Sequence, residues 1–112
     1  EMLDPGRGAI GVYSQRFPDA VQDVLEVTRR AILSRTVLEF DYCSLDENQS
    51  HRIIRPLEIE AWDSTLTVTG WCETRGDFRV FRLDRMSGTR LLERGFRPEA
   101  GKRLNDYLER TK

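Results

Sequence analysis

The stretch DFRVFRLDRM, residues 77–86, places an arginine at every third position of a segment that otherwise has the composition of a buried strand. The arginines are Arg79, Arg82 and Arg85, and most residues between them are large and apolar. Arginine keeps its charge when it is partly buried, and it binds phosphate or carboxylate through two parallel hydrogen bonds. We therefore expect this strand to help form a pocket for an anionic, nucleic-acid-like ligand.

The composition is that of one small domain. A chain of 112 residues, 38% hydrophobic and 33% charged, can build a single modest core. It has no apolar run of about 18 residues that could span a membrane, and its first residues lack the pattern of a secretory signal. The two cysteines, Cys43 and Cys72, have no metal-ligand spacing. We expect buried free thiols and a cytoplasmic protein.

The charge is unevenly distributed. A net charge of −1 argues against indiscriminate binding of polyanions. Residues 75–94, however, carry six arginines against three acids, and only two of the 18 basic residues are lysines. A sheet with arginine and no lysine favours specific contacts over a solvated surface. The alternative is that each arginine forms a structural ion pair with one of the carboxylates of Glu58, Glu60, Asp77, Asp84 and Glu93.

Hydrophobic periodicity divides the chain into four parts. Residues 1–16, with three glycines and a proline, predict a coil. Apolar residues recur at helical spacing over 17–35, and the period changes to two over 36–96. Residues 97–112, with a proline near the first turn, predict a C-terminal helix.

Five strands are predicted within 36–96. They cover residues 36–43, 52–62, 65–73, 78–86 and 89–94. Short turns between consecutive strands favour an antiparallel meander, and twisted strands with small residues such as Gly70 tend to close into a barrel. The predicted fold class is therefore mainly β (α+β): a small five-stranded antiparallel β-barrel flanked by an N-terminal and a C-terminal helix.

Catalytic and metal-binding patterns are not found. His51 is the only histidine, and no further ligands stand at metal-binding spacing from it. No serine or cysteine nucleophile motif and no phosphate-binding glycine loop is present. The carboxylates on the strands are typical of a solvated strand face. We expect no metal, no cofactor and no enzymatic activity.

Four stretches carry a resemblance to a known family. They are AILSRTVLEFDY (31–42), RIIRPLEI (52–59), GWCE (70–73) and DFRVFRLDRM (77–86). From Ala31 to about Phe96 the sequence resembles the WYL domain, a ligand-sensing module of bacterial DeoR-like transcriptional regulators. The last stretch matches the family's Arg-x-Phe-Arg-Leu-Asp-Arg-hydrophobic pattern almost unbroken. The resemblance implies an Sm-like barrel that binds a nucleic-acid fragment or nucleotide and controls an attached DNA-binding domain.

The resemblance also implies site residues. By position, Arg52 and the three arginines of residues 77–86 match the family's basic positions, with Asp84 orienting one of them. Lesser candidates for polar or stacking contacts are His51, Tyr42 and Trp71. The Trp-Tyr-Leu tripeptide that names the family is replaced near residues 66–68, so two aromatics that could stack on bases are missing. The residues before Ala31 are too few for a helix-turn-helix, so we expect contact with duplex DNA only through another domain.

Alternation along a strand limits which arginines can act together. Arg79 and Arg85 share one face of a regular strand and Arg82 lies on the other, so without a bulge the three cannot line one groove.

Two functions remain open. The first is a ligand-sensing regulatory domain that binds a single-stranded nucleic acid or nucleotide and works as a homodimer. The second is a dimerisation or protein-interaction module that has lost its ligand. The first predicts salt-sensitive oligonucleotide binding that Arg82→Ala abolishes without loss of fold. The second predicts no binding, and it predicts destabilisation by Arg82→Ala because a carboxylate loses its partner.

Overall fold

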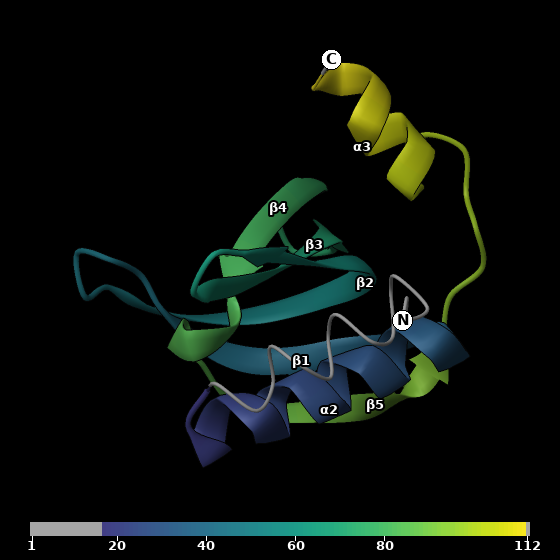
Figure 1. Ribbon diagram of the computed structural model, residues 1–112. Coiled ribbons are helices and arrows are strands. Elements are labelled where there is room, and N and C mark those ends of the chain that lie inside the picture. The colour runs from purple at the N-terminus through teal and green to yellow at the C-terminus, as the bar shows by residue number, and fades with distance from the viewer. Residues whose placement is uncertain (1–16, 112) are drawn as a thin grey trace, which may run out of the picture.

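The computed structural model describes residues 17–111 and shows a curled sheet that is preceded by one helix and followed by another (Figure 1). The coil predicted for residues 1–16 lies outside the described residues. The elements are α2 (Asp19–Ser34), β1 (Thr36–Cys43), β2 (Gln49–Trp62), β3 (Thr65–Cys72), β4 (Asp77–Arg82), the 3₁₀ turn η1 (Leu83–Arg85), β5 (Met86–Gly95) and α3 (Leu104–Arg110). The predicted class, mainly β with five antiparallel strands and two helices, is confirmed.

The five strands form one antiparallel sheet in the order β4-β3-β2-β1-β5. The first part of the long strand β2 pairs with β1 and its second part pairs with β3. The pairing changes at Ile54, which faces both Leu38 of β1 and Cys72 of β3. β4 and β5 are the two edges, and no pairing joins them among the described residues. The barrel expected from the sequence is therefore an open, strongly curled sheet.

The curl is strong enough to bring the two sides of the sheet into contact. The ring of Phe81 on β4 lies 5.1 Å from that of Phe40 on β1, although two strands separate β4 from β1 within the sheet. Helix α2 covers this inner face and runs along β1 and β5 (Figure 1). The core consists of apolar residues of α2 and of the inner strand faces: Val21, Val24, Leu25, Ala31, Leu38, Phe40, Ile54, Leu66, Val68, Cys72, Phe81, Leu83 and Met86.

The predicted strand at residues 78–86 is interrupted. β4 ends at Arg82, and η1 turns the chain into β5 at Met86. Leu83 is fully buried, so it anchors this turn in the core. Arg85 consequently belongs to the turn, and its direction does not follow from strand alternation with Arg79 and Arg82.

The C-terminal helix is shorter than the predicted 97–112. Residues 97–103 form a link without helix or strand, and the helix spans Leu104–Arg110. None of its residues is buried. The helix stands on the outer face of the sheet, away from the core (Figure 1).

Gly70 permits the close packing of β3 on β2, and its replacement by alanine tests the curl. A Cβ atom at Gly70 would lie 2.8 Å from the Arg55 carbonyl oxygen and 2.9 Å from Ile54 Cδ1. We expect Gly70→Ala to lower the free energy of unfolding by about 3 kcal/mol, since overpacking in a sheet core forces the backbone to shift. Urea denaturation followed by circular dichroism measures this.

Gly76→Ala is the matched control. A Cβ there meets nothing within 4 Å, but φ is +65°, so the change costs only the ~1 kcal/mol of a left-handed alanine. A loss for Gly70→Ala no greater than that for Gly76→Ala would contradict the role of Gly70.

Candidate functional site

Three of the residues singled out from the sequence meet at one end of the inner face. Arg52 faces Phe40 across the β1–β2 ladder and Tyr42 faces Ser50, so Arg52 and Tyr42 point to the same side of the sheet. The guanidinium carbon of Arg52 lies 5.3 Å from the centroid of the Phe81 ring. This is the geometry of a cation–π contact.

Tyr42 connects this cluster to the open edge of β4. Its ring packs edge-on against Phe81, with 4.9 Å between the ring centroids. Its hydroxyl accepts a hydrogen bond from the backbone N–H of Arg82 at 3.0 Å. Because that N–H would otherwise be an unpaired donor at a strand edge, the bond fixes β4 beside β1.

Arg52 is held in place without neutralisation of its charge. Its Nε donates to the hydroxyl of Ser50 at 3.1 Å. Among the residues that the structure describes, no carboxylate forms an ion pair with it. Its remaining guanidinium N–H groups can therefore bind an anion.

Arg85 extends the positive surface past the end of β1. Its Nη1 donates to the carbonyl oxygens of Cys43 at 3.2 Å and Ser44 at 2.8 Å. A hollow of about 440 Å³ lies here, lined by Cys43, Asp84, Arg85, Met86 and Ser87. Met86 faces Tyr42 across the β1–β5 ladder, so the hollow adjoins the Arg52 cluster.

Arg82 contributes its backbone N–H to this region, but its side chain, next after Phe81 and opposite Thr67, faces the outer side of the sheet, where it pairs with Asp84. Its Nε and Nη2 donate to the two oxygens of that carboxylate at 3.1 and 2.7 Å. We define the basic end of the inner face by the side chains of Tyr42, Arg52, Phe81 and Arg85. Arg52 and Arg85 form no ion pair among the described residues, so they give this region a net positive charge.

Arg79 and Trp71 are two of the predicted residues that lie outside the basic end. Nη1 of Arg79 donates to the Asp77 carboxylate at 3.3 Å, which also accepts from Arg110 of α3 at 2.7 Å. The bond from Arg110, followed by one from the Phe78 backbone N–H, lowers the pKa of Asp77 to about 2. These contacts tie β4 to the C-terminal helix.

Trp71 belongs to the same contact. Its ring packs edge-on against Phe78, with the centroids 5.1 Å apart, and Lys102 Nζ lies 5.3 Å from its centroid. Phe78 in turn meets Tyr107 of α3 at 5.4 Å. The structure therefore uses Trp71 and Arg79 to dock the C-terminal segment and does not bring them to the basic end.

His51 points away from Arg52, since neighbouring residues of a strand face opposite sides. Its Nδ1 lies 2.8 Å from Asp41 and its Nε2 2.7 Å from Glu39, which also pairs with Arg90 at 2.6 Å. The hydrogen bonds to Asp41 and then Glu39 raise the pKa of His51 above its usual 6.5. His51 thus joins a charge network on the outer face.

Sequence reasoning missed two parts of the basic end. Phe81, one of the apolar residues between the arginines of residues 77–86, also supports the guanidinium of Arg52. The carbonyls of Cys43 and Ser44, which hold Arg85, carry no signal in the residue types. Both contacts join segments about 30 to 40 residues apart, so only the folded chain reveals them.

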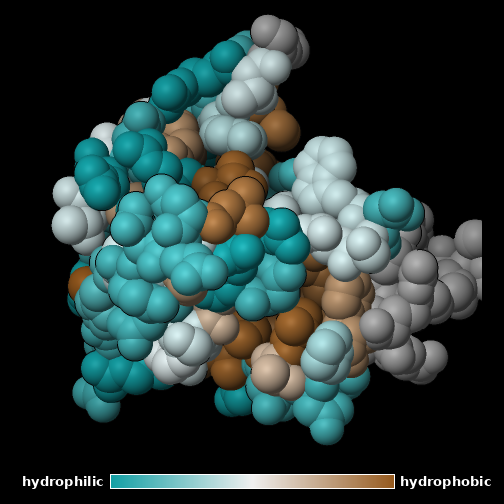
Figure 2. Space-filling model, turned by 90° about the vertical axis from the view of Figure 1, so that its left-hand side faces the viewer, coloured by the Kyte–Doolittle hydropathy of each residue, from teal (hydrophilic) through white to brown (hydrophobic). Residues whose placement is uncertain are grey.

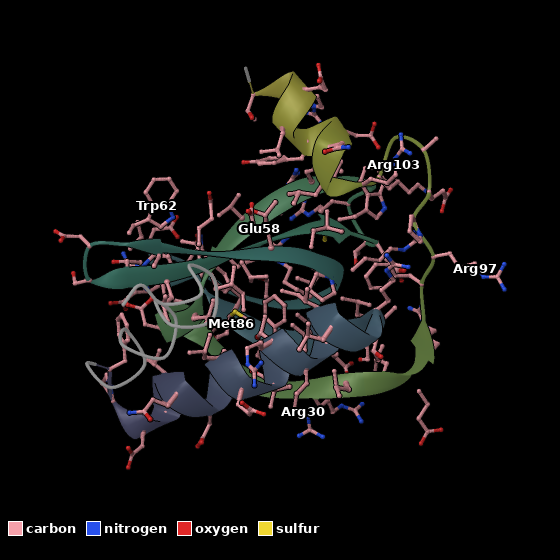
Figure 3. The ribbon with its side chains drawn as sticks, turned by 45° about the vertical axis from the view of Figure 1, so that its right-hand side comes forward. Arg30, Glu58, Trp62, Met86, Arg97 and Arg103 are labelled. Carbon is pink, nitrogen blue, oxygen red and sulfur yellow. The ribbon has the colours of Figure 1, made fainter. Side chains whose placement is uncertain are left out.

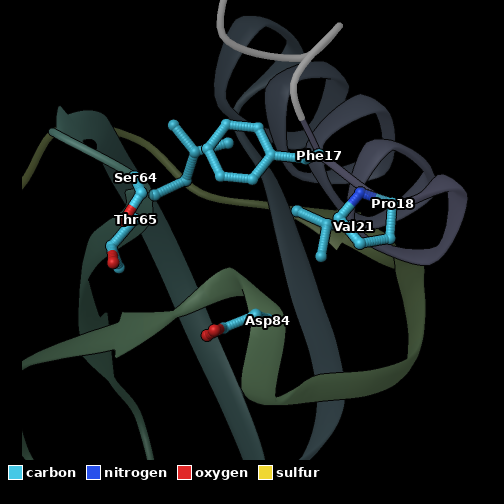
Figure 4. A pocket seen from close by; sticks show the side chains of 7 residues that line it. Phe17, Pro18, Val21, Ser64, Thr65 and Asp84 are labelled. Atoms are coloured by element: carbon cyan, nitrogen blue, oxygen red, sulfur yellow. The ribbon is translucent and has the colours of Figure 1, made fainter.

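A second cavity of about 380 Å³ lies where α2 begins, beside η1 and the β2–β3 turn. Its lining is mostly apolar: Phe17, Pro18, Val21, Ser64, Thr65, Leu66 and Asp84. Figure 4 shows Asp84 across the cavity from Phe17. Figure 2, a view of the left-hand side of Figure 1, shows hydrophobic side chains in a hollow between hydrophilic ones. With a carboxylate as its one charged group, the cavity does not suit an anion.

Metal and membrane sites were also considered. Within residues 17–111, no group of three or more His, Cys, Asp or Glu side chains is placed to hold a metal ion. No helix in that range is both long enough and apolar enough to cross a bilayer.

The described residues form a small, mainly β domain in which an arginine without an ion-pair partner lies against an aromatic ring. The WYL domain family matches residues 23–91, and the chain belongs to this family. A solved structure similar to it is the proteasome accessory factor B/C (PafBC) of Arthrobacter aurescens, with 26% identity and a TM-score of 0.63. The likeness covers 67% of this chain and 12% of the PafBC chain. No curated protein sequence gives a significant match.

The charge network of His51 generates a prediction that one titration tests. Because this is the only histidine, its Cε1 proton gives a single signal that can be followed in a proton NMR titration. We expect a pKa above 6.5, with a fall toward 6.5 in Glu39→Gln. The bonded, protonated form stabilises the fold fully below pH 6.5, and this stabilisation is lost as the pH rises through the higher folded-state pKa. A wild-type pKa at or below 6.5 would contradict the network.

Proposed function

We propose that the chain is a ligand-sensing domain of a bacterial transcriptional regulator and binds the phosphates of a single-stranded nucleic acid or nucleotide at the basic end. Membership of the WYL domain family and the likeness to PafBC support a regulatory, non-enzymatic role. The observation that carries the ligand proposal is Arg52: a guanidinium placed over Phe81, oriented by Ser50 and not neutralised by a carboxylate.

The chemistry of the basic end favours phosphate over base recognition. Arg52 has free N–H groups for a bidentate contact, and Arg85 lines the adjoining hollow. The Tyr42 ring packs edge-on against both Phe40 and Phe81, so it offers little face for a stacked base. This agrees with the missing aromatics near residues 66–68. The proposed ligand therefore binds mainly through its charge.

The position of the basic end suggests how binding reaches the rest of a regulator. Arg82 directly precedes η1, and Arg85 is its last residue. η1 packs against α2. A phosphate bound by Arg85, the last residue of η1, would change the contacts of η1 and hence the position of α2. A DNA-binding domain attached before α2 would sense this change. Binding of duplex DNA through such a domain is part of the proposal.

The second candidate, an interaction module without a ligand, is favoured by the ion pairs of Arg79 with Asp77 and Arg82 with Asp84. The Arg82–Asp84 side chains are 38% and 43% exposed, and such surface pairs contribute about 0–1 kcal/mol. Arg82→Ala should therefore leave the fold stable under either function, and its stability does not separate them. Arg52 does separate them.

Substitution of Arg52 tests the ligand proposal directly. We expect a fluorescein-labelled single-stranded oligonucleotide to bind the wild type at 50 mM salt, with affinity falling steeply toward 200 mM. Arg52→Gln should weaken binding by about tenfold and reduce the salt slope by about one, because one phosphate contact is lost. Fluorescence anisotropy measures both quantities, for DNA and RNA alike.

Arg97→Gln is the matched control for charge. Arg97 is exposed and extends away from the body of the molecule (Figure 3). Arg97→Gln changes the net charge by the same amount as Arg52→Gln. It should change the affinity less than about twofold, because salt screens an exposed charge that lies far from the bound phosphate. Equal losses in the two variants would show non-specific attraction. Absence of any binding at 50 mM salt would leave the interaction module as the better function.

A further inference from the structure

The outer face of the sheet carries two carboxylates that lack a basic partner. Cross-strand register pairs Glu58 with Thr69 and Glu60 with Thr67. Within residues 17–111, neither glutamate accepts a hydrogen bond or forms an ion pair. Partial burial, followed by the charge of Glu60, raises the pKa of Glu58. Most other charged groups of this sheet are paired, so these two stand out.

Apolar side chains flank the two carboxylates. Val80 on β4 faces Thr69 and is 46% exposed, and Trp62 at the end of β2 is 55% exposed. Trp62 is fixed, because its Nε1 donates to the Thr67 hydroxyl at 3.0 Å. We call this surface the acidic shelf and define it by Glu58, Glu60, Trp62, Thr69 and Val80.

The acidic shelf also contains an unsatisfied buried group. Thr69 is only 1% exposed, and its hydroxyl has no hydrogen-bond partner among the described residues. The next cross-strand pair on the same face, Trp71 with Phe78, is covered by the C-terminal segment. The shelf itself is left open, although its composition is that of a contact surface: apolar groups beside unpaired charge.

The opposite side of the molecule carries a complementary surface. On α2, Arg29, Arg30 and Leu33 lie at positions that share one helix face. Leu33 is 72% exposed. Arg30 is exposed and unpaired within the described part of the chain, whereas Arg29 contacts Glu26 at 3.5 Å. We call Arg29, Arg30 and Leu33 the basic ridge.

The acidic shelf and the basic ridge cannot meet within one chain. Figure 3 shows Glu58 and Trp62 on one side of the molecule and Arg30 on the other, with the sheet and α2 between them. The two surfaces can therefore pair with each other only between two molecules.

We propose that the acidic shelf of one copy of this chain docks the basic ridge of a second copy. Arg30 would pair with Glu58 and Glu60, while Leu33 would pack against Val80 and Trp62. Nucleic acid is a poor occupant of the shelf, because its phosphates would face two unpaired carboxylates, whereas Arg82, opposite Thr67 on the same face, is paired with Asp84. The chain itself carries a surface that matches in both charge and apolar content. This contact is independent of ligand binding at the basic end.

The two surfaces differ, so the contact is head-to-tail. After two copies join, one shelf and one ridge remain free, and further copies can add until a ring closes. This differs from the twofold homodimer expected from the sequence. Because the charges lie on exposed side chains, the association should weaken with salt.

Sedimentation velocity with two complementary variants tests this arrangement. The shelf variant carries Glu58→Lys and Glu60→Lys, and the ridge variant carries Arg30→Gln and Leu33→Gln, so the two altered surfaces do not attract each other. We expect the wild type to self-associate at about 0.5 mM, since a small exposed contact belongs to the weak class. Each variant alone should associate at least about tenfold more weakly, because its only interface pairs a native surface with an altered one.

An equimolar mixture of the two variants separates a head-to-tail contact from a symmetric one. The shelf variant keeps its ridge and the ridge variant keeps its shelf, so the mixture should form a complex that stops at two chains. Glu93→Lys, an exposed charge reversal on β5, should associate like the wild type, and circular dichroism confirms the fold of each variant. A monomeric wild type, unchanged association of either variant, or a mixture that stays monomeric would overturn the proposal.

Discussion

The contact of Phe81 with Phe40 and Tyr42 is the interaction on which the rest of the structure depends. It joins β4 to β1 across the inside of a sheet in which those strands are not neighbours. The long β2 makes the curl possible, since it pairs with β1 at one end and β3 at the other. Gly70 lets β3 approach β2 closely. Arg52 reaches an aromatic ring of β4 only because the sheet is curled.

The regular elements could be predicted from the sequence because they follow local periodicity. Alternation over 36–43 and helical spacing over 17–35 each describe one surface buried against one core. The break in residues 78–86 could not be predicted, because Leu83 continues the apolar pattern although it anchors a turn. The prediction that the sheet closes into a barrel was wrong for a related reason. Hydrogen bonding between β4 and β5 depends on the path of η1, which no local pattern encodes.

The candidate site was predictable only where it rests on short-range patterns. Strand alternation alone places His51 and Arg52 on opposite faces. The pairing of Arg82 with Asp84, two residues away, is equally local. By contrast, two contacts arise from tertiary packing: Arg52 lies against the Phe81 ring, and Arg85 donates hydrogen bonds to the carbonyl oxygens at the end of β1. Trp71, an aromatic suited to stacking, packs against the C-terminal segment, a contact that also arises only from tertiary packing.

The central claim is that the basic end, and not the region around Trp71, binds phosphate groups. Its most direct test is a titration of the ¹⁵N-labelled chain with a short single-stranded oligonucleotide, followed by two-dimensional NMR. The account predicts that the Nε–H signal of Arg52, the backbone signal of Arg82 and the signals of Arg85 shift together and saturate. Shifts confined to Trp71, Arg79 and the C-terminal helix would contradict it.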